Sequence, residues 1–148
     1  MATRRPPPKP ESLPRLREYA PRDFRAVRRL WKVVGLHVSP SDTRRELERS
    51  RKRDPDLFLV AENEGRLIGV VLGRFDGRRG WVNHLAVHPE AQSQGIGSVL
   101  MRELERRLRA KGCPKVNLHV VSTNEKVCAF YERIGYSKRD LVYMDKWL

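Results

Sequence analysis

The spacing of hydrophobic and polar residues switches between a helical and a strand period along the chain. Apolar side chains recur at helical spacing in residues 24–34, 96–108 and 127–134, which predicts three amphipathic helices. The highly charged segment 42–53 is expected to form another helix. Gly35 ends the first apolar stripe, as glycine commonly does just past the end of a helix.

Strand-like segments lie between these helices. Residues 57–62, 67–75 and 81–87 are rich in apolar side chains, and the turn sequences Asn63-Glu64-Gly65 and Asp76-Gly77 separate them. Strands joined by short turns pair antiparallel, so these three are expected to form a meander.

Further strands are expected at 13–19 and 115–121, with one or two closing strands in 136–148. The predicted order is β-α-α-β-β-β-α-β-α-β(-β). This order indicates an α/β (α+β) fold in which a mixed sheet carries helices on both faces.

Length and composition indicate one folded domain preceded by a tail. The chain has 148 residues, of which 39% are hydrophobic and 33% charged, a balance typical of a single globular domain. Residues 1–12 are basic and contain four prolines, so we expect a disordered tail there. The domain is then expected to span 13–148.

The chain is strongly basic. Its 31 Lys and Arg residues against 18 Asp and Glu give a net charge of +13, which suggests an anionic partner such as nucleic acid or a phosphate-bearing cofactor. The basic residues are spread over the tail and several helix faces, so most are expected to be solvated. A non-catalytic module that binds nucleic acid or an acidic partner is the alternative hypothesis, although no nucleic-acid motif is present.

Several other classes of protein are not expected. No apolar run reaches the roughly 18 residues that a membrane span needs, and the basic start at 1–10 is not followed by the apolar stretch of a signal peptide. Cys113 and Cys128 have no neighbouring Cys or His at zinc-ligand spacing. We therefore expect a reduced, cytoplasmic protein with no metal site.

Residues 85–100 (LAVHPEAQSQGIGSVL) contain a glycine loop, residues 92–97, between a predicted strand and a predicted helix. Gly95 and Gly97 let the backbone approach a ligand closely, because no Cβ is in the way. The first amides of the helix have no partners within it and suit a pyrophosphate. The loop is not a dinucleotide fingerprint, because Leu100 stands where a third glycine is required.

Two motifs resemble those of the GCN5-related N-acetyltransferases. Gln92, Gly95 and Gly97 match the family's Arg/Gln-x-x-Gly-x-Gly/Ala pattern for acyl-CoA binding. Asn124 and the sequence AFYERIGY at 129–136 resemble its second signature. The likeness covers nearly the whole chain after the tail and extends to the order of the elements. The chain resembles small bacterial members of the family, including those similar to ribosomal-protein N-terminal acetyltransferases.

The resemblance implies an enzyme that uses acetyl-CoA and no metal. Its reaction would be direct attack of a primary amine, from a protein N-terminus or a small molecule, on the acetyl thioester. The pantetheine arm would lie between the splayed strands at 81–87 and 115–121. The implied cofactor-binding residues are Leu85, Val87, Gln92, Gln94, Gly95, Ile96, Gly97, Ser98 and Asn124.

Tyr131 matches the position of the family's usual general acid. A phenol is protonated at neutral pH and can give a proton to the departing thiolate. The alternative is that Tyr131 is a core aromatic residue, since it shares the apolar stripe of its helix with Val127 and Ile134.

The general base is less well defined by the resemblance. Related N-terminal acetyltransferases often carry a glutamate on the strand that corresponds to 115–121, and His119 occupies that place here. An imidazole can accept an ammonium proton near neutral pH. Other members use the preceding strand, but Trp81 and Asn83 at the matching positions are not bases, and His84 is expected to point to the other face.

The acceptor would enter on the side opposite the cofactor, framed by the 35–41 loop and the segment 138–141. Similar enzymes are monomers or homodimers, and the oligomeric state is left open. Binding of nucleic acid or a membrane is not expected to be the main function.

Overall fold

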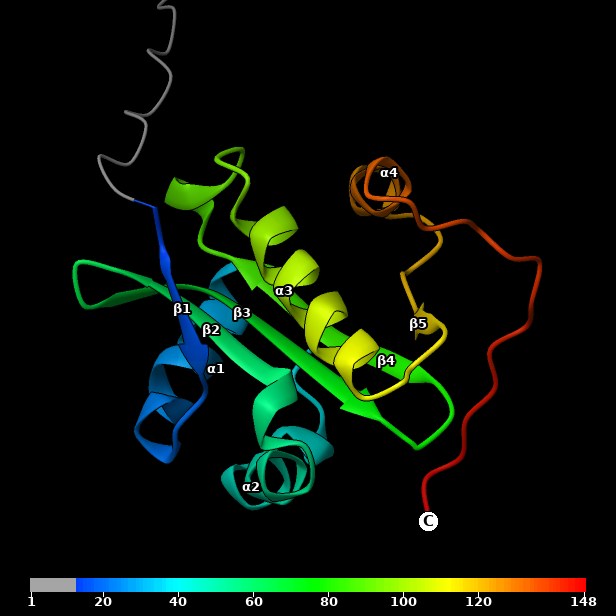
Figure 1. Cartoon of the computed structure of the whole chain (residues 1–148), viewed down its shortest axis with the longest axis horizontal. Coiled ribbons are helices and arrows are strands. Elements are labelled where there is room, and N and C mark those ends of the chain that lie inside the picture. The colour runs from blue at the N-terminus through cyan, green and yellow to red at the C-terminus, as the bar shows by residue number, and fades with distance from the viewer. Residues whose placement is uncertain (1–12) are drawn as a thin grey trace, which may run out of the picture. The chain divides into compact units, whose positions relative to one another are not determined.

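A five-stranded mixed sheet is the centre of the first part of the chain (Figure 1). The computed structural model describes residues 13–148. The strands follow the order of the sequence across the sheet: β1 (Arg15–Glu18), β2 (Phe58–Asn63), β3 (Arg66–Phe75), β4 (Gly80–Val87) and β5 (Val116–Leu118). The first four pair antiparallel, and β5 runs parallel to β4. The predicted meander and the mixed sheet are therefore confirmed.

The helices occupy the predicted segments. They are α1 (Phe24–Val33), α2 (Arg44–Arg53), α3 (Ile96–Ala110) and α4 (Glu125–Arg133). The chain divides into two compact units, one ending at Leu118 and one beginning at His119. The sheet and the first three helices belong to the first unit, and α4 belongs to the second. The tail predicted at 1–12 lies outside the described residues.

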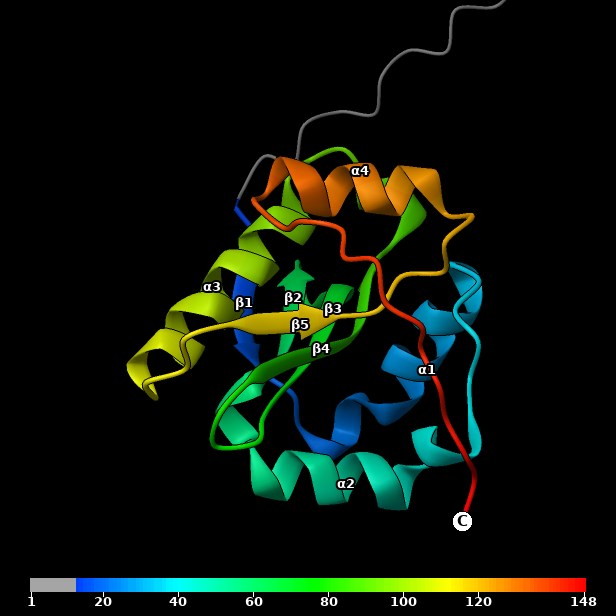
Figure 2. The same ribbon diagram turned by 90° about the vertical axis from the view of Figure 1, so that its right-hand side faces the viewer.

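Helices cover both faces of the sheet in the first unit (Figure 2). On one face, α3 lies directly on β3: a Cβ built at Gly69 would be 2.9 Å from Leu100, and Gly73 is in similarly tight contact with Leu104. On the other face, Trp31 of α1 belongs to a buried cluster that also contains side chains of α2, β2, β3 and β4. The absence of side chains at these glycines lets the long helix approach the sheet closely.

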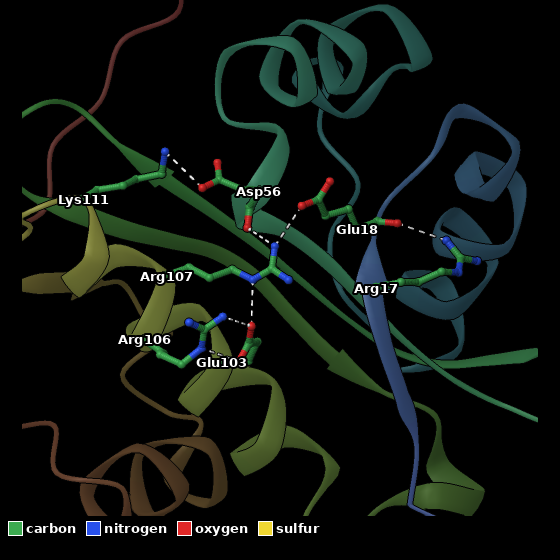
Figure 3. A network of polar contacts seen from close by, with 7 residues as sticks. All are labelled: Arg17, Glu18, Asp56, Glu103, Arg106, Arg107 and Lys111. Carbon is green, nitrogen blue, oxygen red and sulfur yellow. Dashed lines mark hydrogen bonds and ion pairs between the residues drawn. The ribbon is translucent and has the colours of Figure 1, made fainter.

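Charged side chains join α3 to the edge of the sheet (Figure 3). The Arg107 guanidinium binds the Glu18 carboxylate of β1 at 2.9 Å, the Asp56 carbonyl oxygen at 3.0 Å and Glu103 at 2.8 Å. Hydrogen bonds from Arg106 and Arg107 lower the pKa of Glu103 to about 2. A half-buried network of this kind fixes the helix along β1 as well as along the core.

The strand predicted at 115–121 is shorter than expected. β5 spans three residues and pairs with β4 only from Gly80 to Val82. His119 lies beyond its end, in the second unit. The prediction that His119 lies on this strand is therefore wrong.

No strand follows α4 in the described residues, so the one or two closing strands predicted at 136–148 are not formed. Leu141, Val142 and Met144 are 82%, 87% and 84% exposed. Their apolar character suggested a strand, but a strand also needs a hydrogen-bonded neighbour. This segment has no such ladder in the described part of the chain.

Candidate functional site

The start of α3 is open to a ligand. Gly95, its N-cap residue, has φ 80°, and Ser93 before it has φ 65°. A Cβ at Gly95 would meet nothing within 4 Å. No side chain caps this helix and its first turn has no acidic residue. The same is true of α1, which continues directly from the turn Pro21–Asp23, whereas Thr43 caps α2 and Asn124 caps α4. The first amides of α3, together with the positive end of its dipole, are thus available to an anion.

Short-range contacts hold the residues before α3 in place. The turn Pro89–Ala91 is capped by His88, whose Nδ1 accepts the N–H of Glu90 at 3.2 Å. Gln92 donates from Nε2 to the Val87 carbonyl oxygen at 3.0 Å, which ties the glycine loop to the end of β4. The loop is therefore positioned by its own side chains before any ligand arrives.

A β-bulge in β4 sets the direction of its main-chain groups. Asn83 is the extra residue where the register between β3 and β4 shifts. The N–H of His88 bonds to the carbonyl of Ile68 on β3 at 2.8 Å. By the alternation of an antiparallel ladder, Leu85 and Val87 then point their N–H and C=O groups away from β3, towards the β5 side.

That side of β4 is not paired with a strand beyond Val82 in the residues that the structure describes. The main-chain groups of Leu85 and Val87 therefore form a short edge next to the start of α3, and Gln92 already bonds one of them, the Val87 carbonyl. An extended ligand with amide groups can bind such an edge as a further strand would. The structure thus brings together the predicted cofactor residues of the first unit: Leu85, Val87, Gln92, Gln94, Gly95, Ile96, Gly97 and Ser98.

On the opposite face of the sheet, His84 forms a pair that the sequence did not indicate. Its Nε2 lies 3.1 Å from Oδ1 of Asp42, whose side chain is only 6% exposed. The ring also makes an edge contact with Trp31, with the two ring centroids 4.6 Å apart. The sequence predicted that His84 and Trp81 point to different faces, but the bulge in β4 puts both on the same face, so that prediction is wrong. Asp42 was missed, and its only local signal is its place three residues after Ser39 in a capping box.

The second unit contains the other predicted residues. Asn124 caps α4 by accepting the N–H of Val127 at 3.3 Å. Tyr131 is buried beside the rings of Phe130 and Tyr136, and this burial raises its pKa to about 12. His119 lies before α4, with its ring 4.6 Å from that of Tyr143. The functional roles of Asn124, Tyr131 and His119 stay predictions.

No cluster of three or more His, Cys, Asp or Glu side chains in residues 13–148 could hold a metal ion. None of the helices in this part of the chain combines the length and the apolar character needed to cross a membrane.

A family model and a sequence relative both identify this chain as similar to acetyltransferases. The model of the acetyltransferase (GNAT) family matches residues 14–136. An acetyltransferase of Pectobacterium atrosepticum is 41% identical over 126 residues, which is 85% of this chain and 89% of the relative.

Solved structures with the same fold include two acetyltransferases. Naa20 of Chaetomium thermophilum, in complex with a bisubstrate analogue, is 27% identical with a TM-score of 0.74, over 83% of this chain and 70% of that one. The PaiA N-acetyltransferase of Thermoplasma acidophilum, in complex with coenzyme A, has a TM-score of 0.77 at 20% identity, over 88% and 94% of the two chains.

Proposed function

Because the chain belongs to the GNAT family of acetyltransferases, we propose that it transfers the acetyl group of acetyl-CoA to a primary amine. The observation that carries this proposal is the start of α3, where an uncapped helix follows two residues of positive φ. The acceptor amine belongs to a protein N-terminus or to a small molecule.

The residues of the first unit fit the chemistry of acetyl-CoA. Its pyrophosphate would accept hydrogen bonds from the amides between Gly95 and Ser98, where no acidic side chain competes. Its pantetheine amides would bond the exposed edge at Leu85 and Val87. Gln92 would act by holding the Val87 carbonyl and hence the loop. The net charge of +13 would favour approach of this polyanionic molecule.

Tyr131 is the proposed acid. Acetyl-CoA presents a thioester carbon to the amine, and the sulfur needs a proton when the C–S bond breaks. Tyr131 keeps its phenolic proton throughout the neutral range, because burial raises its pKa to about 12. Asn124 would contact the coenzyme A arm in addition to capping α4. His119 is one candidate for the base, from the resemblance alone.

A thermal-shift titration with acetyl-CoA tests the cofactor site. A ligand present at 100 times its Kd stabilises a protein by about 2.7 kcal/mol, so the wild-type protein should unfold several degrees higher. Gly95→Glu should abolish this shift, because a side chain and a negative charge then occupy the place of the pyrophosphate.

Gly65→Glu is the matched control. Gly65 also has a positive φ, 74°, and open space around it, but it lies in the turn between β2 and β3. The control should lose similar intrinsic stability and keep the acetyl-CoA shift. Equal shifts in wild type and Gly95→Glu, or none in wild type at millimolar ligand, would reject the site.

A further inference from the structure

We propose that His84, held by Asp42, is the residue that removes the proton from the acceptor amine. The inference rests on the proposed function and names the base for that same reaction. His84 is in the middle of β4, and Asp42 ends the short helical turn Pro40–Asp42 between α1 and α2. Forty-two residues separate them in the sequence, and the fold places their side chains 3.1 Å apart.

The two oxygens of the Asp42 carboxylate have separate partners. Oδ2 accepts the N–H of Ser39 at 2.9 Å and its hydroxyl at 3.1 Å, while Oδ1 faces the His84 ring. Arg28 donates to the main-chain carbonyl of Asp42 at 2.8 Å. One oxygen thus fixes the loop and the other fixes the imidazole, so the carboxylate cannot turn without breaking several hydrogen bonds.

This arrangement selects one tautomer of His84. An ionised carboxylate only accepts hydrogen bonds, so the bonded nitrogen, Nε2, must carry a hydrogen. The neutral ring then has its lone pair on Nδ1, which is the atom that can take a proton. After protonation, the Asp42 charge lies next to the imidazolium and balances it, as in catalytic carboxylate–histidine pairs.

The His84 ring packs against Trp31 but is not fully buried. Trp31, which is buried, contacts it edge-on at 4.6 Å, yet the His84 side chain remains 21% exposed. The charged group in contact with the ring is Asp42, and Arg28 lies against the Asp42 carbonyl. His88 differs, because its Nδ1 already accepts the N–H of Glu90.

The position of His84 in β4 also suits this role. The main-chain groups of its neighbour Leu85 belong to the proposed cofactor edge, while the His84 side chain faces α1 and the α1–α2 connection. The proposed base and the proposed cofactor edge thus come from consecutive residues of one strand. As the N–C bond forms and the C–S bond breaks, Nδ1 takes one proton from the nitrogen and the sulfur takes one from the acid. Exchange with solvent then restores both groups.

The tautomer can be tested in the wild-type protein. A two-dimensional ¹H–¹⁵N spectrum of the histidine side chains at pH 8, assigned by the signals missing in His84→Gln, should show Nε2–H for His84. In Asp42→Asn the fraction of the Nδ1–H tautomer should rise, and in the control Asp56→Asn it should stay the same. An Nδ1–H tautomer in wild type would overturn the proposal.

Kinetics test the catalytic role. With the fastest acceptor from a screen of N-terminal tetrapeptides and small amines, His84→Gln should lower kcat about 100-fold or more. Its acetyl-CoA thermal shift should match that of wild type. The fall of kcat/KM at the acidic end of its pH profile, called the acidic limb below, should flatten in His84→Gln and persist in His119→Gln.

The outcomes separate the two proposals. If wild type binds no acetyl-CoA, the proposed function fails and this inference fails with it. If His84→Gln is folded, binds acetyl-CoA and retains the acidic limb, only the assignment of the base is rejected. Loss of that limb in His119→Gln alone would give the role to His119.

Discussion

The local contacts of Gln92 and Tyr131 bear on the roles proposed for them. The Gln92 amide donates to Val87, so the glutamine of the motif fastens the glycine loop to β4. Tyr131 is buried in the second unit, where its ring contacts those of the half-buried Phe130 and Tyr136. Its burial disfavours the phenolate and raises its pKa, so the phenol is protonated at neutral pH and has a proton to give.

Tyr131→Phe should bind acetyl-CoA normally but turn over more slowly, by about 10²-fold or more for loss of a general acid. The raised pKa also predicts a pH effect. The unfolded phenol ionises near pH 10 and the folded one near pH 12, so the folded state holds more protons between these values. The free energy of unfolding should therefore fall from pH 10 to pH 12 in wild type.

Chemical unfolding at several pH values measures this slope. It should be shallower in Tyr131→Phe and unchanged in Tyr143→Phe, a control at an exposed tyrosine. An unchanged slope and an unchanged turnover in Tyr131→Phe would both contradict the assignment.

Among the elements, α3 combines two properties: its first turn is uncapped, and the rest of the helix packs tightly on β3. Gly73 leaves room for Leu104, and Gly80 leaves room for Leu108. The Arg107 contacts to Glu18 and Asp56 hold the same helix from the side of β1. The open N-terminus is thus supported by packing further along the helix.

Gly73→Ala should destabilise the protein by about 1–3 kcal/mol, because the new methyl group overpacks against Leu104. Leu104→Ala should cost about 2–5 kcal/mol by leaving a cavity. The double variant should cost less than the sum, since the added methyl group partly fills that cavity.

Denaturant unfolding of the four proteins gives the coupling energy. Pairing Gly73→Ala with Leu108→Ala is the control, and those two changes should be additive because Leu108 packs at Gly80. Additive costs for Gly73 and Leu104 would contradict the packing described for α3.

Much of the element order followed from local patterns. The hydrophobic period of a helix or a strand reflects which face of that element is buried. The structure contains the helices predicted at 24–34 and 96–108, and the strands predicted within 57–87, close to the predicted bounds. The prediction of closing strands was wrong, because apolar residues at 141–144 indicate extended backbone but not whether a neighbouring strand is available. The bulge at Asn83 depends on pairing with β3 and has no local signal.

At the scale of the whole molecule, the parts of the site that are close together in the sequence could be predicted, and the parts that are far apart could not. The glycine loop is one continuous segment, so its residues could be identified together. The Asp42–His84 pair joins positions 42 residues apart through the tertiary fold, and a buried aspartate has no signal in composition. The charge of +13 suggested an anionic partner, and the open start of α3 gives that suggestion a specific place.

The central claim is acetyl transfer from acetyl-CoA to an amine, and product analysis with acetyl-labelled acetyl-CoA tests it most directly. Wild-type protein should convert an acceptor amine to a labelled amide, with one coenzyme A thiol released for each amide by mass spectrometry and thiol assay. Gly95→Glu should give neither product. Thiol release without any labelled amide, across N-terminal tetrapeptides and small amines, would contradict the account.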